Sequence, residues 1–217
     1  MVHSKTVLVL AGGDGAPPGP LSGVDGARVI AADSGVDLAH ALGLRVDVAV
    51  GDFDSVTAAG LSRAEAEGAA IERHPLEKDA TDLELALDRA LALGAQRVVV
   101  VGGAGGRLDH LLAGALVLGA ERYAPFELDA LLGPARAHVV RGARSLAGSP
   151  GELVSLLPLH GAAEGVATTG LRYALHGETL APGTTRGVSN VLEAAAAHVS
   201  VARGVLLAVF PGEGGAR

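Results

Sequence analysis

The aspartates that could carry chemistry are concentrated in the first half of the chain. Nine of the twelve lie between Asp33 and Asp109. In the segment GDFDS, Asp52 and Asp54 are two residues apart, so an extended backbone would turn both carboxylates to the same side. Two such oxygen ligands suit a hard divalent cation. The structural alternative is a turn in which Asp54 or Ser55 caps the next helix.

A second group of polar residues follows in HPLEKDATD. Lys78, Asp79 and Asp82 stand at the predicted entrance to a helix, where Thr81 and Glu84 have the spacing of a capping box. Helix amides and a lysine can hold phosphate oxygens, and Asp82 can reach a metal that bridges those oxygens. A solvated lysine and ordinary first-turn acids are the alternatives.

Glycine-rich segments follow two predicted strands. They are AGGDGAPPG, which begins at Ala11, and GGAGGR, which runs from Gly102 to Arg107. Glycine lets backbone amides approach an anion closely, and Arg107 would add a charged fork of donors. His110 could position a phosphate or transfer a proton, although a structural hydrogen bond is the alternative. Neither GxGxxG nor a GK[ST] ending is present, so a dehydrogenase or a P-loop enzyme is not expected.

The elements that must position these residues alternate between strand and helix over about the first 130 residues. The predicted strands are Thr6–Ala11, Arg28–Ala32, Val46–Val50, Ala69–Arg73 and Arg97–Val101, and the predicted helices are Gly35–Leu42, Ala58–Gly68, Thr81–Leu93 and Leu108–Ala120. Continuous Val, Ile, Leu and Ala runs indicate parallel strands covered on both faces. Asp33, Asp52 and Asp54 each come just after a strand, at the edge where open α/β sheets bind ligands.

The pattern changes at about Glu127. Short apolar runs, separated by Gly, Pro and Thr clusters, predict a small antiparallel β-domain. These runs include Glu152–Leu157, His198–Val201 and Val205–Phe210. The turn-rich segment Gly142–Gly151 suggests the boundary, with domains expected at residues 1–142 and 143–217.

The composition excludes several classes of protein. The chain has no cysteine, which excludes disulfides, thiolate catalysis, Cys-ligated zinc and iron–sulfur clusters. A net charge of -7 and only five aromatic residues (Phe, Tyr and Trp) argue against nucleic-acid binding. No apolar run approaches the length of a membrane span, and the start has too few apolar residues for a signal peptide. A cytoplasmic protein is therefore expected.

Four motifs, taken in order, resemble the thiamine pyrophosphokinase family. They are ADSG at 32–35, GDFDS at 51–55, HPLEKDATD at 74–82 and GGRLDH at 105–110, and the likeness continues into GLRYAL at 170–175 and RGVSN at 186–190. The resemblance implies an α/β fold, with a Rossmann-like parallel sheet and flanking helices, followed by a smaller antiparallel β-sandwich. It further implies a homodimer that uses Mg²⁺ and transfers the diphosphate group of ATP to the hydroxyl of thiamine, releasing AMP.

The resemblance also implies roles for individual residues. Asp52, Asp54 and Asp82 would be the metal and catalytic carboxylates, together with a catalytic Lys78. The ATP site would comprise Asp33, Ser34, Asp79, Thr81, Arg107, Asp109 and His110, and the thiamine site would contain Ser189 and Asn190. The chain departs from the family at Val191, where an acid often stands, and in having no tryptophan, the ring that stacks on thiamine in some members.

Two other functions are compatible with parts of the sequence. A magnesium-dependent glycosyltransferase could use GDFDS as its metal clamp on a nucleotide sugar, but this leaves HPLEKDATD and RGVSN unexplained. A non-catalytic sensor of nucleotide or thiamine is disfavoured because every candidate metal carboxylate is retained.

Overall fold

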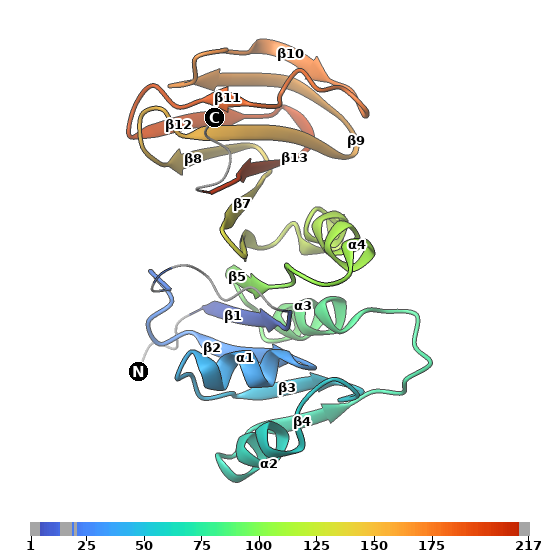
Figure 1. The fold of residues 1–217 in the computed structure, drawn as a ribbon. Coiled ribbons are helices and arrows are strands. Elements are labelled where there is room, and N and C mark those ends of the chain that lie inside the picture. Colours follow the sequence, from blue (N-terminus) through green and yellow to red (C-terminus); the bar gives the residue numbers. More distant parts are fainter. Residues whose placement is uncertain (1–4, 14–18, 20, 213–217) are drawn as a thin grey trace. The chain divides into compact units, whose positions relative to one another are not determined.

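The chain forms two compact units in a computed structural model that describes residues 5–13, 19 and 21–212 (Figure 1). The first unit comprises Met1–Val117 and Pro125–Gly133, and the second comprises Leu118–Ala124 and Pro134–Arg217. Within the described residues, no helix is long and apolar enough to cross a membrane.

The first unit is built on a parallel sheet with the strand order β4-β3-β2-β1-β5-β6. Its strands are β1 (Thr6–Ala11), β2 (Arg28–Ala32), β3 (Val48–Gly51), β4 (Ala70–Arg73), β5 (Arg97–Gly102) and β6 (Glu127–Leu132). The chain moves outward from β1 to β4 and then returns to place β5 on the other side of β1. The carboxyl ends of β1 and β5 therefore form the point where the strand order reverses, which is where such sheets bind ligands.

Helices cover both faces of this sheet. They are α1 (Gly35–Ala41), α2 (Ala58–Ala66) and α3 (Asp82–Ala92), while α4 (Leu108–Leu118) and a short 3₁₀ helix (Glu121–Tyr123) follow β5. Alternate residues of β1, including Leu8 and Leu10, form a buried cluster with α1 and α2. On the other face, α3 packs against β1, β2 and β3 and buries Ala86, Leu87 and Ala90 at helical spacing.

The second unit consists of antiparallel strands in two layers. They are β7 (Ala135–Val140), β8 (Ala143–Ala147), β9 (Leu153–Thr169), β10 (His176–Leu180), β11 (Asn190–Val191), β12 (Ala196–Ser200) and β13 (Arg203–Phe210). The first part of β9 pairs with β11 and β13, and its last part pairs with β10 and β12. His160 and Gly161 have φ of 56° and 138°, and this irregularity lets one long strand serve both layers. Alternate buried residues of the two layers, such as Val154, Leu156 and Val199, share one apolar core.

The predicted fold class is confirmed, but two local assignments differ. The residues of β6 were read as the start of the antiparallel region, whereas β6 is the sixth parallel strand and pairs with β5. The segment Gly142–Gly151, read as a turn-rich boundary, contains strand β8 and belongs to the second unit. A short apolar run does not reveal which neighbour it pairs with, because pairing is decided by distant residues.

Candidate active site

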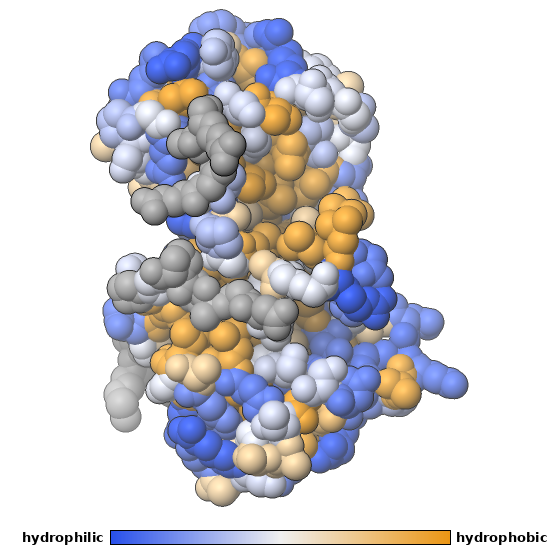
Figure 2. All heavy atoms as spheres, viewed as in Figure 1, coloured by the Kyte–Doolittle hydropathy of each residue, from blue (hydrophilic) through white to orange (hydrophobic). Residues whose placement is uncertain are grey.

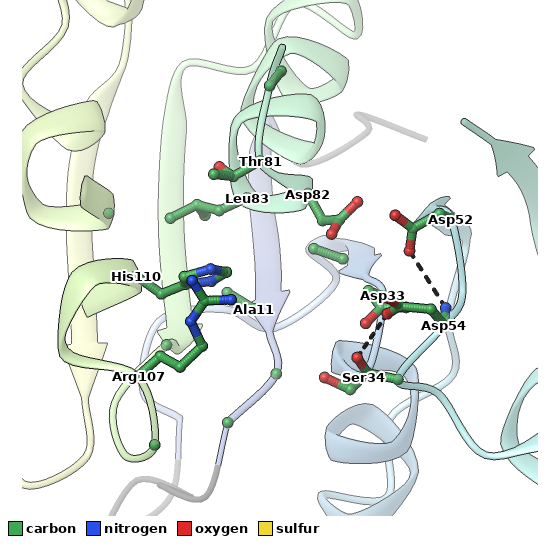
Figure 3. Close-up of a pocket in the computed structure, with 18 of the residues that line it drawn as sticks. Ala11, Asp33, Ser34, Asp52, Asp54, Thr81, Asp82, Leu83, Arg107 and His110 are labelled. Atoms are coloured by element: carbon green, nitrogen blue, oxygen red, sulfur yellow. Dashed lines mark hydrogen bonds between the residues drawn. The ribbon is translucent and has the colours of Figure 1, made fainter. Parts of the chain in front are cut away.

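Four carboxylates meet at the carboxyl ends of β2 and β3 (Figure 3). Asp33 directly follows β2, Asp52 and Asp54 follow β3, and Asp82 is the first residue of α3. One oxygen from each of Asp33, Asp52 and Asp54 lies within 4.8 Å of the others. Such a set of oxygen donors suits a small divalent cation.

The Asp52–Asp54 pair converges through a turn and not through extended backbone. Phe53 has φ of 62°, in the left-handed region. The reversed chain brings the Asp54 N–H to 3.3 Å from Asp52 Oδ1, and the Ser55 hydroxyl donates to Asp54 Oδ1 at 2.7 Å. The predicted extended geometry is therefore wrong, although both carboxylates reach the same place. Asp54 is not the cap of the next helix either, because Thr57 accepts from the Gly60 N–H at the start of α2.

Asp33 is the most buried carboxyl of the cluster, with 7% of its surface exposed. Burial raises its pKa above the ordinary value, and the nearby charge of Asp82 acts in the same direction. Among the described residues, Asp33 Oδ1 has no hydrogen-bond partner. Gly51, with φ of 148°, permits this crowding, since a Cβ there would lie 3.1 Å from Asp82 Oδ1. A buried acceptor without a donor is satisfied when a cation binds, so the residues present fit a metal ion.

Lys78 neutralises part of the acidic cluster. Its Nζ donates to Asp52 Oδ2 at 2.6 Å and lies 2.9 Å from Asp82 Oδ1, and its side chain is only 13% exposed. Burial opposes the charge of the ammonium, but the two carboxylates outweigh it and raise the pKa of Lys78. The hydrogen bond from Lys78 lowers the pKa of Asp52. The three converging carboxylates are thus Asp33, Asp52 and Asp54. Asp82, which was also predicted to bind the metal, contacts Lys78 beside them.

Residues 11–13 and 102–107 of the two glycine-rich segments lie together at the reversal point of the sheet, while residues 14–18 of the first segment lie outside the described part of the chain. The Gly103 N–H donates to the Ala11 and Gly12 carbonyls at 3.0 and 2.7 Å, which ties the end of β5 to the end of β1. At Gly13, with φ of 98°, a Cβ would lie 2.7 Å from the Ala104 carbonyl. Both segments line a cleft of about 690 Å³ that also contains the acidic cluster. The cleft has the size of a small-molecule binding pocket, and glycine-rich backbone and carboxylates both line it.

Arg107 and His110 face this cleft from the start of α4 (Figure 3). The Arg107 fork donates to both oxygens of Asp109 at 3.2 and 2.6 Å. This contact lowers the pKa of Asp109 to about 2. Asp109 therefore holds the arginine instead of facing the cleft itself.

The remaining residues predicted for the nucleotide site have different surroundings. Ser34 and Thr81 line the cleft, and the Thr81 hydroxyl caps α3 by accepting from the Glu84 N–H at 3.3 Å, as the sequence spacing predicted. Asp79 is exposed and lies outside the lining of the cleft.

The residues predicted to contact thiamine lie in the second unit. Asn190 is only 4% exposed, and its amide is used internally: Oδ1 accepts from Tyr173 N–H at 3.0 Å, and Nδ2 donates to the Tyr173 carbonyl at 2.8 Å. Ser189 is exposed with φ of 58°, and its N–H donates to Ser155 Oγ at 3.1 Å. Asn190 therefore holds Tyr173, whose side chain is 61% exposed. Tyr173 is not among the residues predicted to contact thiamine, although it lies in GLRYAL and is one of only two tyrosines in the chain.

Comparison with known proteins connects both units to one family. Residues 25–123 match the model of the thiamin pyrophosphokinase catalytic domain, and residues 138–206 match the model of the thiamin pyrophosphokinase vitamin B1 binding domain. The chain belongs to the thiamin pyrophosphokinase family. The two matches together cover most of its length, and they follow the order of the two units.

Individual members of the thiamin pyrophosphokinase family are similar to this chain over nearly its whole length. The thiamine pyrophosphokinase of Bacillus subtilis (strain 168) is 28% identical over 217 residues, which are 94% of this chain and 98% of the relative. A crystal structure of thiamine pyrophosphokinase from Bacillus subtilis has a TM-score of 0.80 at 24% identity and covers 96% of this chain and 99% of its own. The crystal structure from Geobacillus thermodenitrificans has a TM-score of 0.78 at 25% identity, covering 97% and 99%.

Proposed function

We propose that the chain transfers the diphosphate group of ATP to the hydroxyl of thiamine and releases AMP, with Mg²⁺ held by Asp33, Asp52 and Asp54. Membership of the thiamin pyrophosphokinase family supports the activity. The observation that carries the site is the convergence of these three carboxylates in a cleft that also contains two glycine-rich turns. A bound Mg²⁺ would neutralise charge on the phosphate oxygens.

The residues of the cleft provide what phosphate transfer requires of a protein, namely positioning and charge. The amides of the glycine-rich turns would hold the phosphates, and Arg107 would leave Asp109 to place its fork on the terminal oxygens. Lys78 would supply a compact cation beside the carboxylates. We assign Asp82 the task of accepting the proton of the thiamine hydroxyl, because it lines the cleft and stands outside the trio that would hold Mg²⁺.

We assign thiamine binding to Ser189 and Tyr173, with Asn190 holding the backbone of Tyr173 in place. The exposed ring of Tyr173, whose backbone is fixed on both sides by Asn190, can stack on an aromatic cation and so compensate for the missing tryptophan. We further propose that the chain works as a homodimer with the thiamine site at the subunit interface. Apolar side chains exposed on α4, Leu108 and Leu112, support a contact with a second copy (Figure 2).

The activity is tested by incubating the protein with ATP, Mg²⁺ and thiamine and separating the products. AMP and thiamine diphosphate are expected in equal amounts. ADP with thiamine monophosphate would refute diphosphate transfer. Consumption of a nucleotide sugar would support the glycosyltransferase alternative, and binding of both ligands without turnover would support a sensor. The Asp52→Asn variant is the control for contaminating activity.

The dimer is tested by light scattering at micromolar concentration and by mixing two inactive variants. Asp54→Asn damages the first unit, and a Tyr173→Ala, Ser189→Ala double variant damages the second. If the site is formed by two protomers, mixed dimers contain one intact site and activity returns. A fully active monomer would contradict the proposal.

A further inference from the structure

Phe53 occupies an unusual position between the two carboxylates of GDFDS. Its φ of 62° is a conformation that glycine, asparagine and aspartate adopt far more readily than a bulky L-residue. This conformation reverses the chain, so that the Asp54 N–H approaches Asp52 Oδ1 at 3.3 Å. Since the backbone of an isolated phenylalanine would relax to negative φ, the surrounding structure must hold the turn.

The Phe53 ring is held from two sides. Its inner side packs against the buried cluster that α1 and α2 form on the sheet. Over the ring lies the Arg73 guanidinium, 5.0 Å from the ring centroid. Strand pairing places Arg73 beside the turn, because Arg73 is opposite Gly51 in the register of β3 and β4. The next residue, His74, donates its N–H to the Gly51 carbonyl at 2.9 Å. Pairing of β4 with β3 thus places Arg73 over the ring of Phe53 at the turn.

We infer that Phe53 is a positioning residue for the metal site, with Arg73 as its clamp. The anchored ring fixes the strained turn, so that oxygens of Asp52 and Asp54 already stand within 4.8 Å of each other and of an Asp33 oxygen before a ligand arrives. The Phe53 side chain itself is absent from the lining of the cleft. This inference rests on the metal site of the proposed function and assigns its geometry to a residue outside it.

The test measures binding of Mn²⁺ without nucleotide, by electron paramagnetic resonance, in the full chain. Phe53→Ala and Phe53→Gly are expected to raise the dissociation constant about tenfold, equivalent to about 1.4 kcal/mol. Glycine accepts the left-handed turn but cannot anchor it, so it should not restore binding. Phe53→Tyr keeps the ring and should rescue affinity, whereas Arg73→Leu should weaken binding by about two- to threefold. The Mg²⁺ concentration for half-maximal turnover should rise by the same factors, with kcat largely recovered at saturating Mg²⁺.

Phe126→Ala is the matched control. Phe126 is 7% exposed and immediately precedes β6, the parallel strand farthest from β4. Its loss should lower thermal stability and leave Mn²⁺ affinity unchanged. Mn²⁺ affinity within twofold of the unaltered protein in Phe53→Gly, or an equal loss in Phe126→Ala, would overturn the positioning role. If Asp52→Asn binds Mn²⁺ as tightly as the unaltered protein, the metal site itself fails and the role of Phe53 fails with it.

Discussion

Replacing Lys78 with methionine should reveal how the acidic cluster is balanced. The substitution keeps the length of the side chain and removes the ammonium that contacts Asp52 and Asp82 at 2.6 and 2.9 Å. Removing one partner of a fully buried pair costs about 3–5 kcal/mol, whereas an exposed pair contributes about 0–1 kcal/mol. With 13% of the lysine side chain exposed, Lys78→Met should lower the free energy of unfolding by roughly 2 kcal/mol, between these two limits.

Divalent cations should restore the stability that Lys78→Met removes. In EDTA, Lys78→Met should melt about 4–8 °C below the unaltered protein, because a chain of this length loses a few degrees per kcal/mol. Mn²⁺ should restore most of the difference, since the ion takes over the neutralisation. Without the competing ammonium, the variant should bind Mn²⁺ about tenfold more tightly, while its turnover falls because a phosphate contact is lost. Tighter metal binding together with slower turnover is the diagnostic result.

The pH dependence follows from the same contact. Lys78 lowers the pKa of Asp52, so its stabilising effect is present above the ordinary aspartate range and disappears as pH falls through the lowered pKa. The difference in melting temperature between the variant and the unaltered protein should therefore vanish in acid.

Lys5→Met is the matched control, because Lys5 is the other lysine of the chain and is exposed. Equal melting temperatures of the two variants in EDTA, or weaker Mn²⁺ binding by Lys78→Met, would refute the reasoning.

Three further outcomes are expected. Asp54→Asn should lower kcat roughly a hundredfold with an unchanged circular dichroism spectrum, because metal-ion catalysis is worth several kcal/mol; near-normal rates at saturating Mg²⁺ would remove Asp54 from the metal site. Arg107→Leu should raise the pKa of Asp109 from about 2 toward the ordinary value, measured by an NMR titration; an unchanged pKa would show that the ion pair does not form in solution. Asn190→Ala should cost about 2–3 kcal/mol in urea unfolding, because it leaves polar groups of Tyr173 unpaired, and should raise KM for thiamine but not for ATP.

Residue patterns along the chain predict the succession of strands and helices from β1 to α4 and the antiparallel class of the second unit. These features depend on local periodicity and on turn-forming residues, which are readable along the chain. The rule that ligands bind at the carboxyl ends of parallel strands also predicts that Asp33, Asp52 and Asp54, which each follow a strand, lie at the ligand-binding edge of the sheet.

Tertiary packing determines which functional groups meet and which contacts hold them. The left-handed turn at Phe53 depends on a ring anchored by Arg73 from the neighbouring strand, and no local pattern announces it. Asp33 joins the converging trio because parallel pairing aligns the ends of β2 and β3, while Asp82 contacts Lys78. Asn190 is directed inward to Tyr173. These contacts join residues that are distant in sequence or that depend on an unusual φ. Strand register and side-chain packing determine them, and neither can be read from a local pattern.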